Sequence, residues 1–381
     1  MKKTILLFVI GMILFGLVLV PVSTALARYS DAAAQPAVNT PAPASTAPAA
    51  AASSTGISDD CSTPTAAAPT AAPTPTPKAA VTQAPPQGAR AASQATAATP
   101  SAPLQTATQG PALPYTLETL TLTSKNLEGA QRIIQVYLPG GYDQNPTRRY
   151  PVLYVFDGQQ LPEIGFEGLL NQLTSASQVN PFIVVAVFST EGDLRREELG
   201  TGSTLNMFGW GTSSEAFNQF LVTELVPKIN STYHTLAGPQ NTGVMGWSLG
   251  GLTAFYVAWQ YPQIFGIVGA FSPSFWWRTP SQPGEELAAR VIPNLVRDSA
   301  ARPGLRMWFE AGTKELPYSD IDNNGVEDMI QDVQDVMSLL GQKGYQNGSD
   351  MVYVEVEGGQ HELSTWETVM PDFLKYAFPL K

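Results

Sequence analysis

The amino-acid sequence predicts an α/β fold in which a mostly parallel central sheet carries helices on both faces. Short runs of apolar and β-branched residues recur through the C-terminal part of the chain, and the later runs alternate with segments of helical periodicity. The runs are apolar throughout rather than at every second position, which is typical of strands that are buried on both faces. Alternation of buried strands with helices indicates crossover connections and therefore a parallel sheet.

Each predicted element follows from one of these patterns. Strands are expected at residues 132–138, 152–156, 182–188, 243–247, 267–271, 305–310 and 351–356. Helices are expected at residues 214–229, 249–259, 286–298 and 326–340, the last with apolar side chains at helical spacing. Because ligands of such sheets bind beyond the carboxyl ends of the strands, the chemistry is expected in the loops that follow them.

The 381-residue chain divides by composition into three parts. Residues 1–27 hold two lysines, an apolar run and Ala25-Leu26-Ala27, the order of a secretory signal peptide, with an N-terminal membrane anchor as the alternative. Residues 28–113 are mostly Ala, Pro, Thr and Ser, which predicts a disordered linker, and such a composition also suits association with a cell wall. Residues 114–381 have the composition and length of one catalytic domain. We therefore expect an extracytoplasmic protein, either secreted or anchored at the cell surface.

Charge and cysteine content exclude some functions. Acidic residues outnumber basic ones by 32 to 21, so the formal net charge is −11. A chain of this charge repels phosphate backbones, which argues against nucleic acid as a partner. The single cysteine, Cys61, cannot form a disulfide within the chain.

A nucleophilic serine is predicted in the segment Gly246-Trp247-Ser248-Leu249-Gly250. This G-x-S-x-G pattern lies between a predicted strand and a predicted helix, where a sharp turn would lift the hydroxyl of Ser248 above the sheet. The start of the following helix supplies backbone N–H groups for an oxyanion. We expect the N–H of Leu249 to serve this purpose with that of Gln159, which follows the strand 152–156.

Serine needs a general base, and this chain has two histidines. In α/β-hydrolase folds the triad follows the order serine, acid, histidine, so His361 fits and His234 does not. The acid should lie between them, after the strand 305–310, and Glu315 is our choice for the residue that orients the imidazole. The alternatives that spacing leaves open are Glu310, Asp320 and Glu362.

Together these motifs resemble the putative esterase family, which includes esterase D, enterochelin esterases, feruloyl and acetylxylan esterases and antigen 85 mycolyltransferases. The resemblance covers about residues 133–378. It rests on the segments Tyr150–Gly158, Gly246–Gly251, Ser272–Trp277 and Gly358–His361, and on Trp366. The chain departs from the family where it has Asp-Gly-Gln in place of His-Gly-Gly, and Gly-Thr-Lys-Glu in place of Gly-Thr-Glu-Asp.

The resemblance implies an α/β-hydrolase fold and a serine carboxylic ester hydrolase that forms an acyl-enzyme and needs no organic cofactor. Its substrates would be siderophore-like esters or esters linked to carbohydrate or lipid. Two alternatives stay open, namely an acyltransferase of the mycolyltransferase type with the same residues and an inactive surface binding module on a hydrolase scaffold. For Trp276 and Trp277 we expect either stacking on substrate rings or burial in the core.

One further motif is typical of calcium loops. Oxygen donors stand at positions 1, 3, 5 and 9 of a loop with glycine at position 6, and a backbone carbonyl is available at position 7. The ligands would be Asp320, Asp322, Asn324, Val326 and Asp328. Because position 12 is Gln331 instead of glutamate, a metal-free turn before the following helix is the alternative to a structural Ca²⁺.

Overall fold

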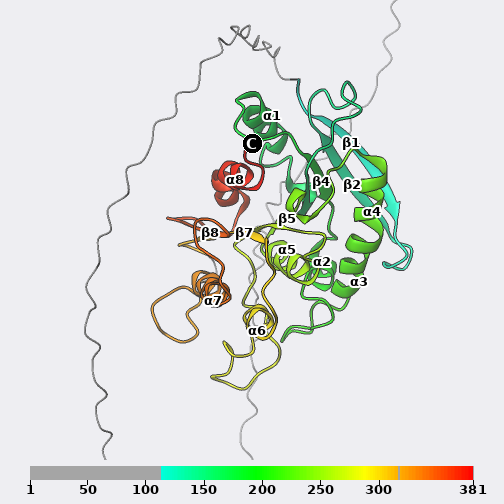
Figure 1. Ribbon diagram of the computed structural model, residues 1–381. Coiled ribbons are helices and arrows are strands. Elements are labelled where there is room, and N and C mark those ends of the chain that lie inside the picture. The colour runs from blue at the N-terminus through cyan, green and yellow to red at the C-terminus, as the bar shows by residue number, and fades with distance from the viewer. Residues whose placement is uncertain (1–112, 316–317, 381) are drawn as a thin grey trace, which may run out of the picture. The chain divides into compact units, whose positions relative to one another are not determined.

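The computed structural model describes residues 113–315 and 318–380, which form an eight-stranded sheet with helices on both faces (Figure 1). The strand order is β1-β2-β4-β3-β5-β6-β7-β8. The strands are β1 (Thr116–Thr123), β2 (Gln131–Leu138), β3 (Val152–Phe156), β4 (Ile183–Val187), β5 (Thr242–Trp247), β6 (Ile267–Phe271), β7 (Arg306–Gly312) and β8 (Met351–Val356). The α/β prediction is therefore confirmed.

Strand direction changes only at one side of the sheet. From β4 to β8 all neighbouring strands are parallel, whereas β2 runs antiparallel to β4 and to β1. The seven predicted strands match β2 to β8 within two residues at each end. The sequence prediction missed β1, because this edge strand is mostly exposed and its alternating Thr and Leu residues form no continuous apolar run.

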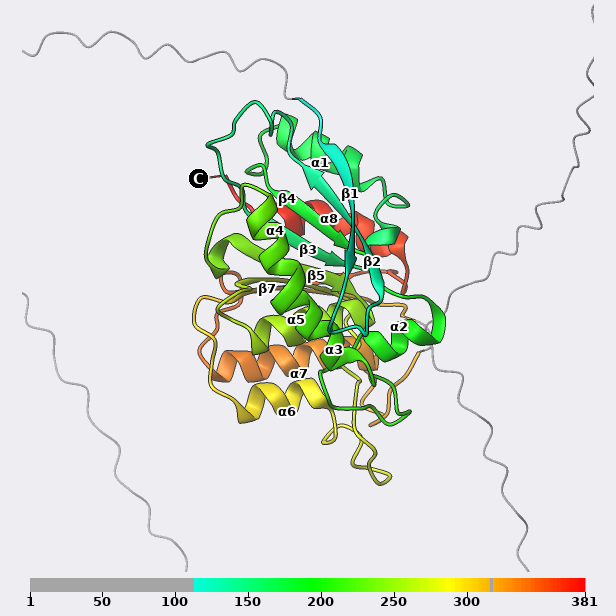
Figure 2. The ribbon, with the colours of Figure 1, turned by 90° about the vertical axis from the view of Figure 1, so that its right-hand side faces the viewer.

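The helices form two layers. Their bounds are α1 (Phe166–Ser175), α2 (Gly192–Glu198), α3 (Ser214–Gln219), α4 (Val226–Thr232), α5 (Leu249–Gln260), α6 (Val291–Asp298), α7 (Asp328–Gln342) and α8 (Leu363–Ala377), with short helical segments at Gly158–Gln160, Phe220–Leu225 and Pro239–Asn241. Figure 2 shows α1 and α8 on one face of the sheet and α3 to α7 on the other. The helices α1, α2 and α8 had not been predicted.

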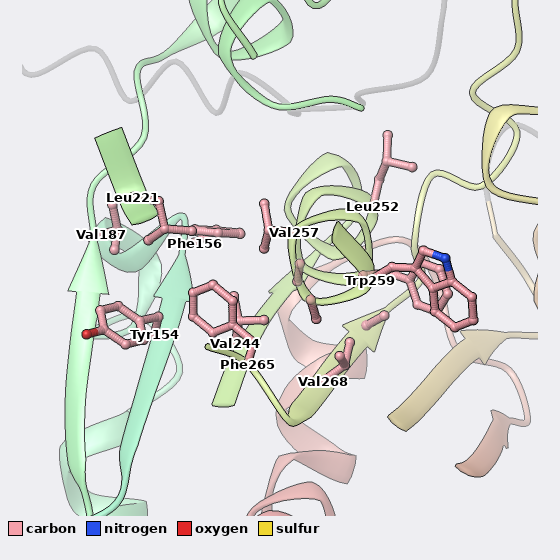
Figure 3. Close-up of a cluster of buried hydrophobic side chains, with 14 of the residues drawn as sticks. Tyr154, Phe156, Val187, Leu221, Val244, Leu252, Val257, Trp259, Phe265 and Val268 are labelled. Carbon is pink, nitrogen blue, oxygen red and sulfur yellow. The ribbon is translucent and has the colours of Figure 1, made fainter. Parts of the chain in front are cut away.

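Side chains that alternate along the buried strands separate the core into two clusters. On β3, Tyr154 and Phe156 pack beneath the α5 layer, whereas Leu153 and Val155 pack beneath α1 and α8. Figure 3 shows the first cluster, in which Phe265 lies edge to face with Tyr154 of β3, while Trp259 lies farther along, on the side of Val268 of β6. Because every residue of β3 is buried, both faces of the strand must be apolar, as the sequence has it.

The sheet places the candidate site residues at one edge. Gln159, Ser248, Glu315 and His361 each follow the carboxyl end of a parallel strand, namely β3, β5, β7 and β8. Parallel strands end at the same edge of a sheet, so residues that are far apart in sequence come together there.

The predicted signal segment and nearly all of the predicted linker lie outside the described residues, so both stay predictions. Within the described residues, no helix has the length and apolar character that a membrane span requires.

One buried hydroxyl gives a stability prediction. Tyr154 is fully buried, and its Oη has no hydrogen-bond partner among the described residues. Burying a hydroxyl group without a hydrogen bond lowers the stability of the fold. Replacing Tyr154 by Phe removes the hydroxyl and should raise the free energy of unfolding by about 1 kcal/mol, measured by urea denaturation. The matched control is Tyr233→Phe, which loses a 2.8 Å hydrogen bond to Glu118 and should lower the free energy of unfolding by about the same amount. A loss of stability in Tyr154→Phe would contradict this account.

Candidate active site

Ser248 occupies a strained turn between β5 and α5. Its backbone has φ 56° and ψ −125°, a conformation that few non-glycine residues adopt. The neighbouring glycines make the turn feasible, since a Cβ on Gly246 would lie 2.6 Å from the carbonyl carbon of Gly250. The turn is held from outside by the Ser248 N–H, which donates to Phe271 O at 2.9 Å. The local structure is that of a nucleophile elbow.

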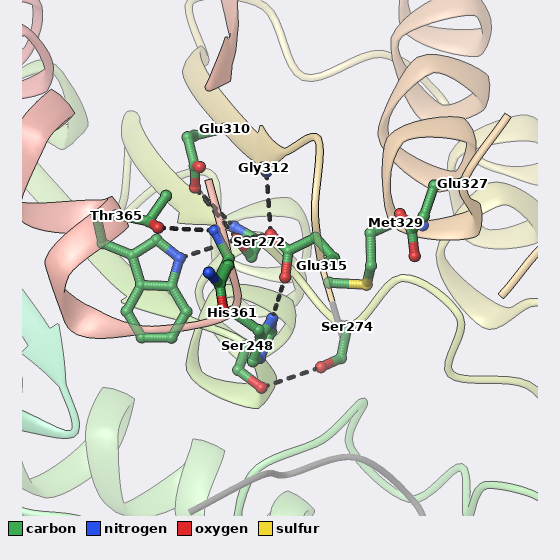
Figure 4. A network of polar contacts seen from close by, with 12 residues as sticks. Ser248, Ser272, Ser274, Glu310, Gly312, Glu315, Glu327, Met329, His361 and Thr365 are labelled. Carbon is green, nitrogen blue, oxygen red and sulfur yellow. Dashed lines mark hydrogen bonds and ion pairs between the residues drawn. The ribbon is translucent and has the colours of Figure 1, made fainter. Parts of the chain in front are cut away.

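Glu315 is buried and pairs with His361, which is partly exposed. The Glu315 carboxylate lies 2.7 Å from Nδ1 of His361, and its side chain is 2% exposed (Figure 4). This contact leaves Nε2 of the imidazole to face a hydroxyl or a leaving group. His361 and Ser248 line the same open pocket of about 580 Å³.

The hydroxyl of Ser248 makes one weak contact in the described part of the chain, with Ser274 Oγ at 3.5 Å. A hydrogen bond of that length is at the limit of the usual range. Ser248 thus has no strong hydrogen bond from its hydroxyl within the described residues, and it lines the same pocket as His361.

Three groups support the charge of Glu315. Ser272 Oγ donates to its Oε1 at 2.6 Å and the Gly312 N–H donates to the same oxygen at 3.0 Å, while His361 contacts Oε2. Burial alone would raise the pKa of Glu315, but these contacts outweigh it and lower the pKa below its usual value. Glu315 is therefore ionised wherever the fold is intact near neutral pH.

Of the two predicted oxyanion donors, Gln159 lines the pocket, and Leu249 directly follows the lining residue Ser248. Leu249 is the first residue of α5, so its N–H is among those that a helix leaves without an internal acceptor. Gln159 lines the pocket, and its side-chain Oε1 accepts from the Ser189 N–H at 3.2 Å. The contact to Ser189 ties the loop after β3 to the end of β4.

A buried ion pair beside this loop had not been predicted. Asp157, with φ 54°, accepts two hydrogen bonds of 2.8 Å from Arg195 of α2, and both side chains are buried. In the same helix, Glu198 pairs with Arg132 of β2. The sequence signal for the pair of Asp157 and Arg195 was the Asp-Gly-Gln variant, which has a carboxylate where many members of the family have histidine. The spacing of residues did not indicate that Arg195 would be the partner of this carboxylate.

Trp366 also takes part in the site. It stacks on Trp247 at 5.5 Å, meets His361 edge to face at 5.3 Å and donates from Nε1 to Ser272 Oγ at 2.8 Å. The imidazole thus rests against an indole that is itself held in place by a hydrogen bond.

The two tryptophans expected near substrate lie outside the residues that line the pocket. Trp277 is fully buried in the core, close to Gly200 and Gly211, so we withdraw it from the substrate-binding set. Trp276 is partly buried and meets Trp210 edge to face at 6.4 Å. Burial in the core therefore accounts for Trp277, whereas the role expected for Trp276 stays a prediction. His234 stacks on Tyr142 away from the pocket.

In the loop at residues 320–328, the side-chain oxygens of the Asp and Asn residues accept hydrogen bonds from nearby backbone N–H groups and from side chains. Asp320 accepts from the N–H groups of Asn324 and Gly325 at 3.0 and 2.9 Å, and Asp322 accepts from Gln331 Nε2 at 2.9 Å. Asn324 accepts from the Val326 N–H at 2.7 Å and Asp328 from the Ile321 N–H at 3.1 Å. Among the described residues, no group of three or more His, Cys, Asp or Glu side chains is close enough to hold a metal. The Ca²⁺ site stays a prediction of the sequence.

Comparisons with known proteins identify related chains. The family model described as putative esterase matches residues 124–377. The iron(III) enterobactin esterase of Dickeya dadantii is 32% identical over 292 residues, which cover 73% of this chain and 60% of that protein. An endo-1,4-beta-xylanase/feruloyl esterase of Xylanibacter ruminicola is 29% identical over 153 residues, 38% of this chain and 20% of that enzyme. The chain therefore spans less than two thirds of the length of both enzymes.

The fold has a solved counterpart. The enterobactin esterase of Shigella flexneri, crystallised in the presence of enterobactin, superimposes with a TM-score of 0.56 at 22% identity. The match covers 72% of this chain and 62% of the other. It confirms the predicted α/β-hydrolase architecture.

A calcium titration tests the loop at residues 320–328. If the loop binds Ca²⁺ in the folded state only, a hundredfold excess over the dissociation constant adds about 2.7 kcal/mol to the free energy of unfolding. Added Ca²⁺ should then raise the melting temperature, and EGTA should reverse the rise. The double variant Asp320→Asn, Asp322→Asn should lose the response, with Mg²⁺ as the control ion. An unchanged melting temperature would establish the metal-free turn.

Proposed function

Because this chain belongs to the putative esterase family, we propose that it hydrolyses carboxylic esters through an acyl-enzyme formed on Ser248, with His361 as general base and Glu315 as the acid that orients it. The observation that carries the proposal is the 2.7 Å contact between Glu315 and His361 in the pocket that the strained Ser248 lines. A carboxylate, an imidazole and a serine in this order suit nucleophilic acyl transfer.

The reaction would proceed in two halves. Ser248 Oγ attacks the ester carbonyl carbon while Nε2 of His361 removes the hydroxyl proton, and the N–H groups of Leu249 and Gln159 stabilise the developing oxyanion. His361 then gives the proton to the leaving alcohol, and the acyl group remains on Ser248. In the second half His361 deprotonates a water molecule that attacks the acyl carbon, the bond to Ser248 Oγ breaks, and His361 returns the proton to Ser248 Oγ as the acid leaves. Glu315 keeps Nδ1 protonated and stabilises the imidazolium that forms in each half.

For the substrate class we favour neutral, hydroxyl-rich esters, such as those linked to carbohydrate, over anionic siderophore complexes. Glu163, Glu191 and Glu362 line the pocket, and the lining cation, Arg195, is engaged by Asp157. This arrangement gives the pocket a negative field that repels anionic acyl groups. Both ester classes occur in the names of the relatives, which are an enterobactin esterase and a xylanase/feruloyl esterase.

We further propose that the reaction takes place outside the cytoplasm, since residues 1–27 have the order of a signal peptide or anchor. The acyltransferase alternative would use the same residues with a sugar or lipid hydroxyl in place of water. Product ratios measured with and without such an acceptor separate the two reactions.

Matched serine and histidine variants test the mechanism. With p-nitrophenyl acetate and butyrate, Ser248→Ala and His361→Ala should each lower kcat/KM by about a thousandfold or more, because the nucleophile and its base act as a unit. Ser175→Ala, at an exposed position of α1, and His234→Ala are the controls and should retain activity. Equal loss in His234→Ala and His361→Ala would contradict the assignment of the base.

Substrate charge tests the proposed ester class. At low ionic strength kcat/KM should be about two- to fivefold higher for p-nitrophenyl butyrate than for p-nitrophenyl hemisuccinate, since exposed charges contribute about 1 kcal/mol or less. The ratio should shrink as salt screens the exposed glutamates, and it should also shrink in Glu191→Gln. A preference for the anionic ester would favour a siderophore-like substrate instead.

A further inference from the structure

A second carboxyl group lies behind the Glu315–His361 pair. Glu310, on β7, is 0% exposed and reaches Ser272, the residue that follows β6 (Figure 4). Its Oε2 lies 3.3 Å from Ser272 Oγ and shares the Ser272 N–H, at 3.1 Å, with the main-chain O of Glu310 at 2.8 Å, whereas its Oε1 has no hydrogen-bond partner among the described residues. The mechanism proposed above makes no use of this side chain.

The hydroxyl of Ser272 has too few protons for all its neighbours. Its oxygen accepts a hydrogen bond from Trp366 Nε1 at 2.8 Å, and its single proton points to Glu315 Oε1 at 2.6 Å. The remaining lone pair faces Glu310. Two oxygens without a proton between them repel each other, so the 3.3 Å contact is favourable when the Glu310 carboxyl carries the proton.

The charges around Glu310 also favour the protonated, neutral form of its carboxyl group. No cation forms an ion pair with it in the described part of the chain. The titratable groups that interact electrostatically with it are Glu315, on the following loop, and Tyr353 of β8, and His361 contacts Glu315 in turn. Burial, aided by repulsion from Glu315 and opposed by Ser272, raises the pKa of Glu310 to about 8.

We propose that Glu310 is a positioning residue whose neutral carboxyl donates to Ser272 Oγ, which in turn donates to Glu315 and holds that carboxylate against His361. The left-handed backbone of Ser272, with φ 37°, fits this role because it leaves the hydroxyl in contact with both carboxyl groups. The relay rests on the proposed function of Glu315 and His361, and it adds a proton that must stay in place for the triad to remain aligned.

Ionisation of Glu310 would disturb this relay. A second negative charge would then compete with Glu315 for the one Ser272 proton, and each carboxylate would weaken the hold of the hydroxyl on the other. Activity should therefore decline at alkaline pH through a group that does not touch the substrate.

The pH dependence of kcat/KM for p-nitrophenyl butyrate tests the relay. In the wild type we expect a decline of about three- to tenfold between about pH 7 and pH 9.5, the cost of weakening one charge-assisted hydrogen bond. Glu310→Gln, whose amide donates but cannot ionise, should keep the activity seen at neutral pH and lose the decline. Glu310→Leu, which cannot donate, should be impaired at every pH. The control is Glu327→Gln, which removes another buried carboxyl with a raised pKa and should leave the decline intact.

Infrared difference spectroscopy provides a readout that does not need activity. In full-length Ser248→Ala, the carbonyl band of a protonated carboxylic acid should be present near neutral pH and vanish at alkaline pH. The double variant Ser248→Ala, Glu310→Gln should lose the part of the band that comes from Glu310, while the part from buried Glu327, whose pKa is also raised, should remain. An unchanged band in that double variant, or an alkaline decline that persists in Glu310→Gln, would overturn the proposal. An active Ser248→Ala would instead overturn the proposed function.

Discussion

The site depends on keeping one carboxylate charged in the interior. Glu315 is almost fully buried, and an unpaired charge there would cost several kcal/mol. Its three partners come from different parts of the chain, namely Ser272 after β6, Gly312 at the end of β7 and His361 after β8. Satisfying this charge therefore sets the relative positions of three strand ends, and with them the position of the imidazole in the pocket.

Backbone strain gathers at the same edge of the sheet. Asp157, Ser248 and Ser272 all have left-handed φ values, and they follow β3, β5 and β6 directly. Such conformations persist only where the surroundings over-determine them. Here the surroundings are strands that are closely packed on both faces, so that any shift would disturb both clusters of the core. The rigid sheet thus stores the strain that presents the Ser248 hydroxyl to the pocket.

Patterns of local origin allowed most of the fold to be predicted. Buried strands such as β3 and β6 were predicted to the residue, since continuous apolar runs bounded by polar turns are unambiguous. The exposed strand β1 and the short, charged helix α2 lack such patterns and were missed. In the site, the order of Ser248, Glu315 and His361 came from motif and topology. The partners of Asp157 and the role of Ser272 depend on tertiary contacts across 38 and 43 residues, which spacing does not encode.

The two ion pairs of α2 have an evolutionary consequence. Arg195 and Glu198 each point inward to a charge on the sheet, Asp157 and Arg132, and all four side chains are largely shielded from solvent. Replacing one member alone would leave the charge of its partner unpaired in the interior. Substitutions at these positions should therefore occur together. The neighbouring Asp193 and Leu194 are exposed and free of that constraint. As such hydrolases diverge, the buried residues on this side of the pocket should therefore be conserved, and substitutions should accumulate at the exposed positions around it.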